Sequence, residues 1–169
     1  MKFHLKTFIS VFIATFVVTV STVFPQMATA KWTRTHASSC MTLGGAPIDT
    51  SYAIYNNSTT AEMYALCAVD DSDYLLKQNL TTLNIHGWDG NSTLKAAAMA
   101  CRSLWHTTGG SCGTLVETAV GKQHFTLQPS RSQWNSTTTA DFGYIWVRLP
   151  RKETTGGISS LRGFYTFGN

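Results

Sequence analysis

The chain has 169 residues, of which 13% are charged, with 13 Lys and Arg against nine Asp and Glu. No run of Lys or Arg interleaves with aromatic residues, so the pattern typical of nucleic-acid-binding proteins is absent. The length fits one domain of ordinary size with enough residues to bury a core.

The first 30 residues predict a secretory signal peptide. Lys2 and Lys6 precede an almost uncharged apolar run over 7–24, and a small-residue triplet follows at 28–30. A basic start, an apolar stretch and small residues before the cleavage point are the three parts of such a segment. An uncleaved membrane anchor is the alternative, because the run approaches the roughly 20 residues of a membrane span. We expect cleavage after Ala30 and no membrane association afterwards.

Cleavage would leave a single domain over 31–169. The removed segment carries two of the 13 basic residues and none of the acidic ones, so the net charge falls from +4 to +2. We expect this domain to be secreted, in the periplasm or the extracellular space. Its partner is then an extracellular ligand and not nucleic acid, and no cofactor is expected.

The four cysteines all lie in the expected mature part, an even number that suits an oxidising compartment. Four cysteines allow three pairings. We favour Cys40 with Cys67 and Cys101 with Cys112, because each bond then joins segments that are close in sequence and that a β-meander brings side by side. Zinc is disfavoured, because the chain has no C-x-x-C pair and His106 gives no familiar zinc spacing.

The first half of the mature chain predicts a series of strands. Extended segments are expected over 32–43, 52–55, 62–69 and 79–89, separated by Gly, Pro, Asn and Asp. Both alternating faces of 62–69 are apolar, as in a strand packed on both sides. In 79–89, Leu83 and Ile85 share one face, whereas His86 and Trp88 share a polar or aromatic face.

Residues 94–118 predict a disulfide-bonded β-hairpin. The alanines at 96–98 and 100 also suit a helix. Ala97, Met99 and Cys101, however, alternate along one strand face, and the neighbouring segments have the same period of two. We therefore favour a strand up to Leu104, followed by a glycine-rich turn.

The remaining segments are aromatic and β-branched, and clusters of Gly, Pro, Ser and Asn separate them. They run over 114–119, 121–127, 138–149 and 158–167. All segments together predict an all-β fold, a single antiparallel β-sandwich that is jelly-roll-like or Ig-like and is stapled by two disulfides.

Several motifs follow one another along the chain: Ser39-Cys40, Leu66-Cys67-Ala68-Val69, the strand over 83–89, Ala100-Cys101, the aromatic strand that ends at Leu149-Pro150, and Ser159, Ser160 and Tyr165 in the last strand. Their order resembles a group of uncharacterised secreted bacterial β-sandwich proteins that contain cysteines. The resemblance implies the fold and the compartment. It implies no activity and no catalytic residues.

The turn at 109–113 reads Gly-Gly-Ser-Cys-Gly and formally matches the G-x-S-x-G pattern of a hydrolase nucleophile. A small secreted serine hydrolase that uses Ser111 is therefore the alternative function. That mechanism needs a strand-to-helix turn, then an acid and a histidine later in the chain. The residues after Gly113 prefer a strand, and no histidine follows Asp141. We therefore favour a hairpin turn and a non-catalytic protein.

Aromatic residues in or beside turns supply the candidate ligand site. Flat rings can stack on sugar faces while Asn and Asp bind hydroxyl groups, although aromatic residues also cap the ends of β-sandwiches. The candidate ligand-binding residues are Trp88, Trp105, His106 and Trp134. The sequence therefore favours a non-catalytic binding or surface-associated module of unknown ligand, with carbohydrate as one candidate class.

A calcium site is conceivable where carboxylates gather. Asp70, Asp71 and Asp73 offer oxygen ligands, which Asp89 and Asn91 from another loop can complete if the loops meet. The spacing is not that of an EF-hand, and a solvated acidic turn is the alternative. The histidines are scattered singly, although His86 and His124 lie in strands of similar type and can form a surface pair.

Overall fold

The computed structural model describes residues 30–71, 76–104, 109–135 and 141–168, which form a sandwich of two antiparallel β-sheets. The strands are β1 (Lys31–His36), β2 (Met41–Gly44), β3 (Pro47–Asp49), β4 (Ile54–Asn56), β5 (Met63–Ala68), β6 (Leu80–Asp89), β7 (Ala97–Leu104), β8 (Gly110–Cys112), β9 (Val116–Glu117), β10 (Gln123–Leu127), β11 (Asp141–Leu149) and β12 (Ser159–Gly168). Single turns of 3-10 helix are η1 (Ala37–Ser39), η2 (Lys77–Asn79) and η3 (Ser132–Trp134).

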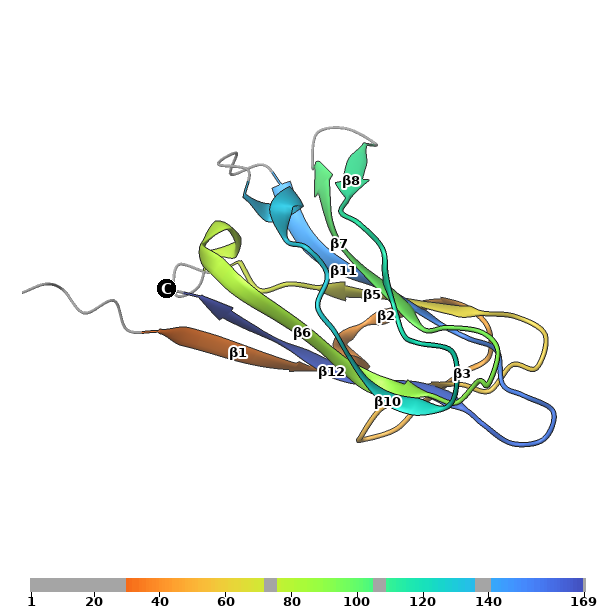
Figure 1. Cartoon of the computed structure of the whole chain (residues 1–169). Helices are drawn as coiled ribbons and strands as arrows, with labels where there is room; N and C mark the ends of the chain where they lie inside the picture. Colours follow the sequence, from red (N-terminus) through yellow and green to blue (C-terminus); the bar gives the residue numbers. More distant parts are fainter. Residues whose placement is uncertain (1–29, 72–75, 105–108, 136–140, 169) are drawn as a thin grey trace, which may run out of the picture.

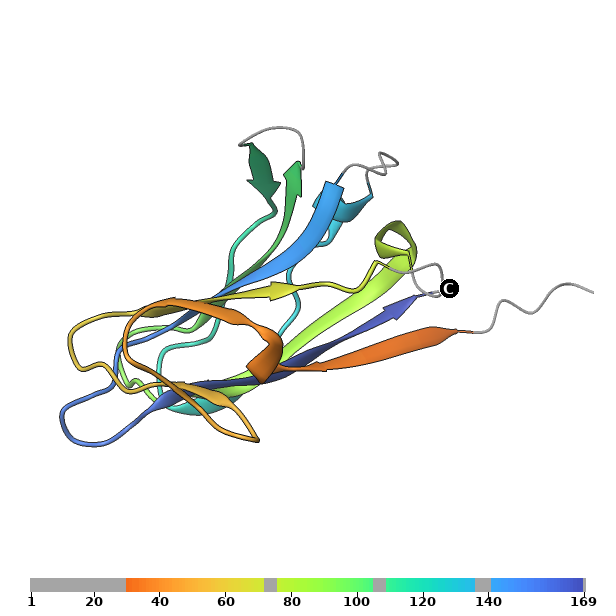
Figure 2. The same ribbon diagram turned by 180° about the vertical axis from the view of Figure 1, so that it is seen from behind.

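The first sheet, called sheet 1 here, has the strand order β10-β6-β12-β4-β3. One side of β12 pairs with β4 near its start and with β1 over the rest of its length. Sheet 2 has the order β2-β5-β11-β7-β8, and β9 also pairs with β7. Figure 1 shows sheet 1 below sheet 2, and the reverse view in Figure 2 shows β1 alongside β12. The first and last strands of the domain are therefore neighbours.

The core lies between the two sheets and follows from the alternation of the strands. In β11, Ile145, Val147 and Leu149 are fully buried while the residues between them are partly exposed, as a strand with one inward face requires. Residues 97–104 form strand β7, which confirms the strand reading over the helix. The predicted all-β antiparallel sandwich is confirmed.

Strand β5 corrects one expectation. Its inward residues Met63, Ala65 and Cys67 are buried, but Tyr64 and Leu66 are only half-buried and Ala68 is exposed. The strand is therefore packed on one side and not on both. No layer of the described chain covers the outer face of sheet 2, so its apolar side chains border solvent.

Both predicted disulfides are confirmed: Cys40 bonds to Cys67, and Cys101 bonds to Cys112. Cys101 and Cys112 lie opposite each other in the β7–β8 pair, as the predicted hairpin requires. Cys40 follows η1 and ties the chain after β1 to β5 in the other sheet. Met41 pairs with Leu66, so Cys40 lies opposite Cys67 at the start of the β2–β5 pair, and both disulfides link neighbouring strands of sheet 2.

Part of the sequence-based prediction lies outside the described residues. This holds for the expected signal peptide except Ala30, for Asp73, and for the pair Trp105 and His106. Within the described part of the chain, no helix is long and apolar enough to cross a membrane.

Candidate functional site

Aromatic and histidine side chains gather on the outer, solvent-facing side of sheet 1. Residues opposite each other in neighbouring antiparallel strands lie about 5 Å apart, so they form rows across the sheet. From one end to the other, the rows are His124, Trp88, Ser160 and Tyr55; then Thr126, His86 and His36; then Asn84, Tyr165 and Arg34; then Thr82, Phe167 and Trp32. In the second row, Gly163 of β12 lies between His86 and His36.

A β-bulge in β12 shapes the centre of this face. Leu161 pairs with Gly87 and Gly163 pairs with His86, so Arg162 is the extra residue of the bulge. Gly163 has a φ of 154°, and a Cβ atom there would lie 2.4 Å from the carbonyl oxygen of Thr35. Only glycine fits both conditions. The bulge breaks the alternation, so that Arg162 and Tyr165 line the same hollow although they are three residues apart.

Side-chain contacts hold several of these groups in place. The ring of His86 stacks on Tyr165 with a centroid distance of 5.5 Å, and its Nδ1 lies 3.1 Å from the Oγ1 of Thr126. Trp88 meets His124 edge to face, with ring centroids 4.7 Å apart. Desolvation by burial lowers the pKa of His86 below its ordinary value. His86 is thus mainly neutral near pH 7 and presents one donor and one acceptor nitrogen.

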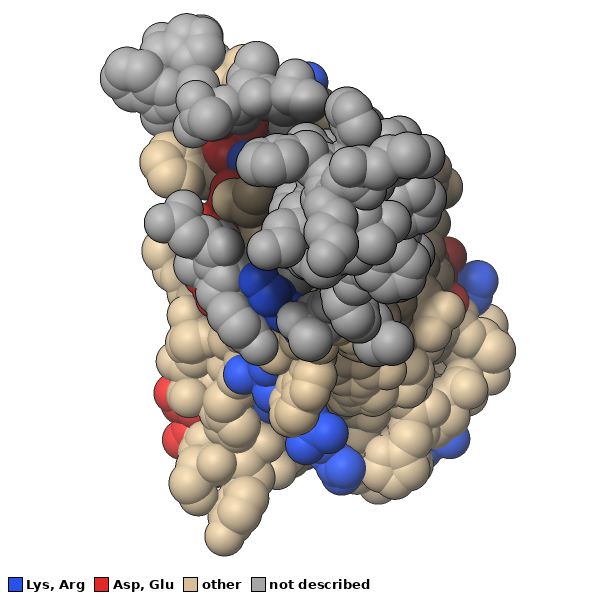
Figure 3. Space-filling view, turned by 90° about the vertical axis from the view of Figure 1, so that its left-hand side faces the viewer, with Lys and Arg blue, Asp and Glu red and all other residues tan. Residues whose placement is uncertain are grey.

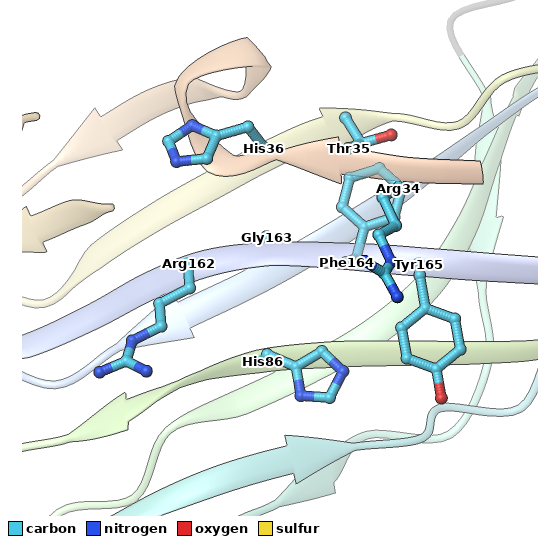
Figure 4. A pocket seen from close by; sticks show the side chains of 8 residues that line it. All are labelled: Arg34, Thr35, His36, His86, Arg162, Gly163, Phe164 and Tyr165. Atoms are coloured by element: carbon cyan, nitrogen blue, oxygen red, sulfur yellow. The ribbon is translucent and has the colours of Figure 1, made fainter. Parts of the chain in front are cut away.

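Arg34 and Trp32 form a second cluster on β1. The guanidinium carbon of Arg34 lies 4.7 Å from the centre of the Trp32 ring, a cation–π contact. Trp32 remains 55% exposed and can accept a further contact. Figure 4 shows Arg34 reaching from β1 across β12 toward Tyr165, whereas the guanidinium of Arg162 points the other way.

Three adjoining hollows mark this face. The largest has a volume of about 480 Å³ and is lined by Arg34, Thr35, His36, His86, Arg162, Gly163, Phe164 and Tyr165 (Figure 4). A second hollow shares Arg34 and Tyr165 with it and reaches Trp32 and Phe167. A third shares His86 and Arg162 and reaches His124. Shared lining residues make them one open groove, which we call the sheet 1 groove.

The predicted ligand residues have three different outcomes. Trp88 lies on the outer face of sheet 1 at the margin of the groove, so its role stays a prediction. The expectation of an available ring at Trp134 is wrong. That side chain is fully buried, and its indole N–H donates a 2.7 Å hydrogen bond to the carbonyl oxygen of Cys101. A large ring that finds a buried acceptor belongs in the core. Trp105 and His106 lie outside the described residues.

The acidic turn does not assemble calcium ligands in the described part of the chain. Asp71 accepts hydrogen bonds from the backbone N–H and the ammonium group of Lys77, the latter at 2.9 Å. Asp89 is fully buried and accepts hydrogen bonds from Thr118 and from the backbone of Ala96. Groups of three or more His, Cys, Asp or Glu able to hold a metal ion do not occur among the described residues.

The geometry at Ser111 differs from that of a catalytic nucleophile. Its hydroxyl donates to the side-chain carbonyl of Gln133 at 2.7 Å and accepts from Nε of Arg102 at 3.0 Å. Neither partner is a general base, because an amide is not basic and a guanidinium stays protonated. Ser111 lies in β8, a strand paired with β7, and not at a strand-to-helix elbow. The hydrogen bonds of Ser111 support a structural role for this residue.

Most of the groove residues were missed by reasoning from sequence. Arg34 and Trp32 come from the first strand and Tyr165 from the last, and only the β1–β12 pairing brings them together. Arg162 was missed because the bulge breaks the expected alternation. The sequence signal that was available is the pair Arg162-Gly163 inside an otherwise uncharged strand, since an isolated glycine in a strand indicates a bulge.

Comparison with known proteins finds no matching family and no matching curated sequence. Among solved structures, the chain is similar to a family 11 carbohydrate-binding module from Clostridium thermocellum in complex with a beta-1,3-1,4-mixed-linked tetrasaccharide. The identity is 8%, the TM-score is 0.39, and 86% of this chain and 92% of that chain are covered. The chain is also similar to the solution structure of CtCBM11, with 7% sequence identity and a TM-score of 0.38. That match covers 86% of this chain and 99% of CtCBM11. At these TM-scores neither similarity assigns a ligand to this chain.

Proposed function

We propose that this chain is a secreted, non-catalytic binding module that holds a carbohydrate in the sheet 1 groove. One observation carries the proposal: a continuous groove whose lining combines exposed aromatic rings with hydrogen-bonding side chains in fixed rows. Aromatic faces stack on the apolar faces of sugar rings, and imidazole, guanidinium and hydroxyl groups bind their oxygens.

Two further features support this function. Strands of a packed sandwich hold the groove, so its residues are largely ordered before a ligand arrives and lose little entropy on binding. Two disulfides and an N-terminal segment with the pattern of a signal peptide suit a protein that acts outside the cytoplasm.

Titration calorimetry with neutral and acidic oligosaccharides tests the proposal. The probes are cellohexaose, xylohexaose, hexagalacturonate and a heparin-derived hexasaccharide. We expect at least one probe to bind, and we expect Trp32→Ala and Tyr165→Ala each to weaken that binding about tenfold, since a ring contact contributes on the order of 1 kcal/mol.

Phe142→Ala is the matched control. Phe142 is 63% exposed, similar to Trp32, but lies at the start of β11 in sheet 2. Binding should be unchanged in this variant. If Phe142→Ala loses binding and Trp32→Ala keeps it, the binding site lies on sheet 2 and not on sheet 1. Failure of every probe, at concentrations up to the millimolar range, would contradict the proposed function.

A further inference from the structure

Charge is distributed unevenly over the two sheets. Most described carboxylates that border solvent are ion-paired: Asp71 with Lys77, Glu62 and Glu117 with Arg148, and Glu153 with Lys122. The buried Asp141 pairs with Arg102. Arg34 and Arg162, by contrast, form no ion pair with any described residue. Two arginines without an ion pair in the described structure therefore lie on the outer face of sheet 1.

The lining of the sheet 1 groove contains no Asp or Glu among the described residues. It contains two arginines and three histidines: Arg34, Arg162, His36, His86 and His124. A polar hollow that shares Thr82 with the groove adds Arg131, which has no ion-pair partner in the described part of the chain either. In the end view of Figure 3, Lys and Arg atoms run down the middle of the lower part of the molecule, where sheet 1 lies.

Unpaired arginines in a groove without carboxylates have a chemical consequence. A guanidinium presents a planar set of donors that matches a carboxylate or a sulfate, and a charge-assisted bond of this kind is about twice as strong as a neutral one. Arg34 lies opposite Tyr165 in the β1–β12 pair. Tyr165 is three residues from Arg162, which is about 10 Å along the strand. The two arginines therefore start from separate points along the strand direction, which suits acidic groups on separate units of one chain.

We propose that the sheet 1 groove binds an acidic glycan, whose carboxylate or sulfate groups pair with Arg34 and Arg162 while its sugar rings contact Trp32 and Tyr165. This inference rests on the proposed function and narrows its ligand class. Nucleic acid is the less favoured polyanion, because residues 31–169 have a net charge of only +2. Tight nucleic-acid binding draws on many phosphate contacts by Lys and Arg.

Calorimetry with matched probes tests the inference. Hexagalacturonate supplies carboxylates, the heparin-derived hexasaccharide supplies sulfates, and cellohexaose is neutral. We expect an acidic probe to bind more tightly than cellohexaose, and its affinity to fall as the salt concentration rises. Arg34→Gln and Arg162→Gln should each weaken it about tenfold. Arg151→Gln is the control, because Arg151 is exposed outside the groove and has no ion pair in the described structure; it should leave the affinity unchanged.

The possible outcomes separate this inference from the proposed function. Binding of hexagalacturonate alone or of the heparin probe alone supports the inference and identifies the acidic group. If cellohexaose binds as tightly as the acidic probes and Arg34→Gln does not weaken its binding, the inference is overturned. The proposed carbohydrate-binding function is then still supported. Single-stranded DNA or phosphatidylglycerol vesicles that bind as tightly as the acidic probes also overturn it, because charge alone would then explain the binding. If no glycan binds, both proposals fail.

Discussion

His86 lines the groove, and its protonation also affects the stability of the fold. It stacks on Tyr165, contacts the hydroxyl of Thr126 and lines two of the three hollows. Desolvation lowers its pKa in the folded protein, whereas in the unfolded chain the imidazole keeps a value near 6.5. Arg34, Arg162 and His36 line the same hollow, so a proton on His86 would add charge to a positive surface.

This difference predicts a loss of stability on mild acidification. As the pH falls through about 6.5, the unfolded chain binds a proton at His86 before the folded chain does, so the free energy of unfolding decreases. In His86→Gln this contribution is absent. Urea unfolding at pH 8 and pH 5 should therefore show a larger decrease for the wild type than for His86→Gln. Equal decreases in the two proteins would contradict the lowered pKa.

Strand β12 shows how far the sequence could be read at the level of single elements. Aromatic and β-branched composition predicted that 158–167 is a strand, and the structure has a strand at Ser159–Gly168. A strict period of two would place Arg162 and Tyr165 on opposite faces, whereas both line the same hollow. The isolated Gly163 is the one local signal of the bulge, and the close approach of Thr35 in another strand cannot be read from local sequence.

The bulge predicts an unusual cost for a single added methyl group. Gly163→Ala introduces a Cβ that would lie 2.4 Å from the carbonyl oxygen of Thr35, at a φ of 154°. Residues held in such backbone regions cost on the order of 1–3 kcal/mol. We expect thermal unfolding to occur at a clearly lower temperature in this variant.

Gly156→Ala is the matched control for the bulge. Gly156 has a similar φ of 146°, but nothing lies within 4 Å of an added Cβ. This variant reports the backbone strain alone, so it should be destabilised less than Gly163→Ala. A loss of similar size in both variants would show that the contact with Thr35 is not decisive.

At the scale of the whole molecule, the candidate site depends on pairing between the two ends of the domain. Lys31 lies opposite Gly168, so the groove combines the first and last strands. Local patterns predicted the layers and both disulfides, because those follow from alternation and from neighbours in sequence. They did not predict the β1–β12 pairing, because strand order within a sheet is set by competition among all strands. The burial of Trp134 was missed for the same reason, since its acceptor lies 33 residues away in β7.

The two disulfides should therefore differ in what they do for the groove. In the chain-entropy relation, closing 27 residues between Cys40 and Cys67 stabilises by about 3.5 kcal/mol and closing 11 residues between Cys101 and Cys112 by about 2.8 kcal/mol. The first bond lies four residues after the end of β1 and fixes the start of β2 to β5, whereas the second staples a hairpin at the edge of sheet 2.

Amide hydrogen exchange tests this difference. Each disulfide is removed by a pair of Cys→Ala substitutions, and exchange is measured under conditions where both variants remain folded. The variant without the Cys40–Cys67 bond should exchange the amides of 31–36 at least several-fold faster than the wild type, because the chain that follows β1 is then no longer fixed to β5 at Cys40. The variant without the Cys101–Cys112 bond should exchange them at the wild-type rate and show faster exchange only in 110–112. Equal protection of β1 in both variants would show that its pairing with β12 alone holds Trp32 and Arg34 in the groove.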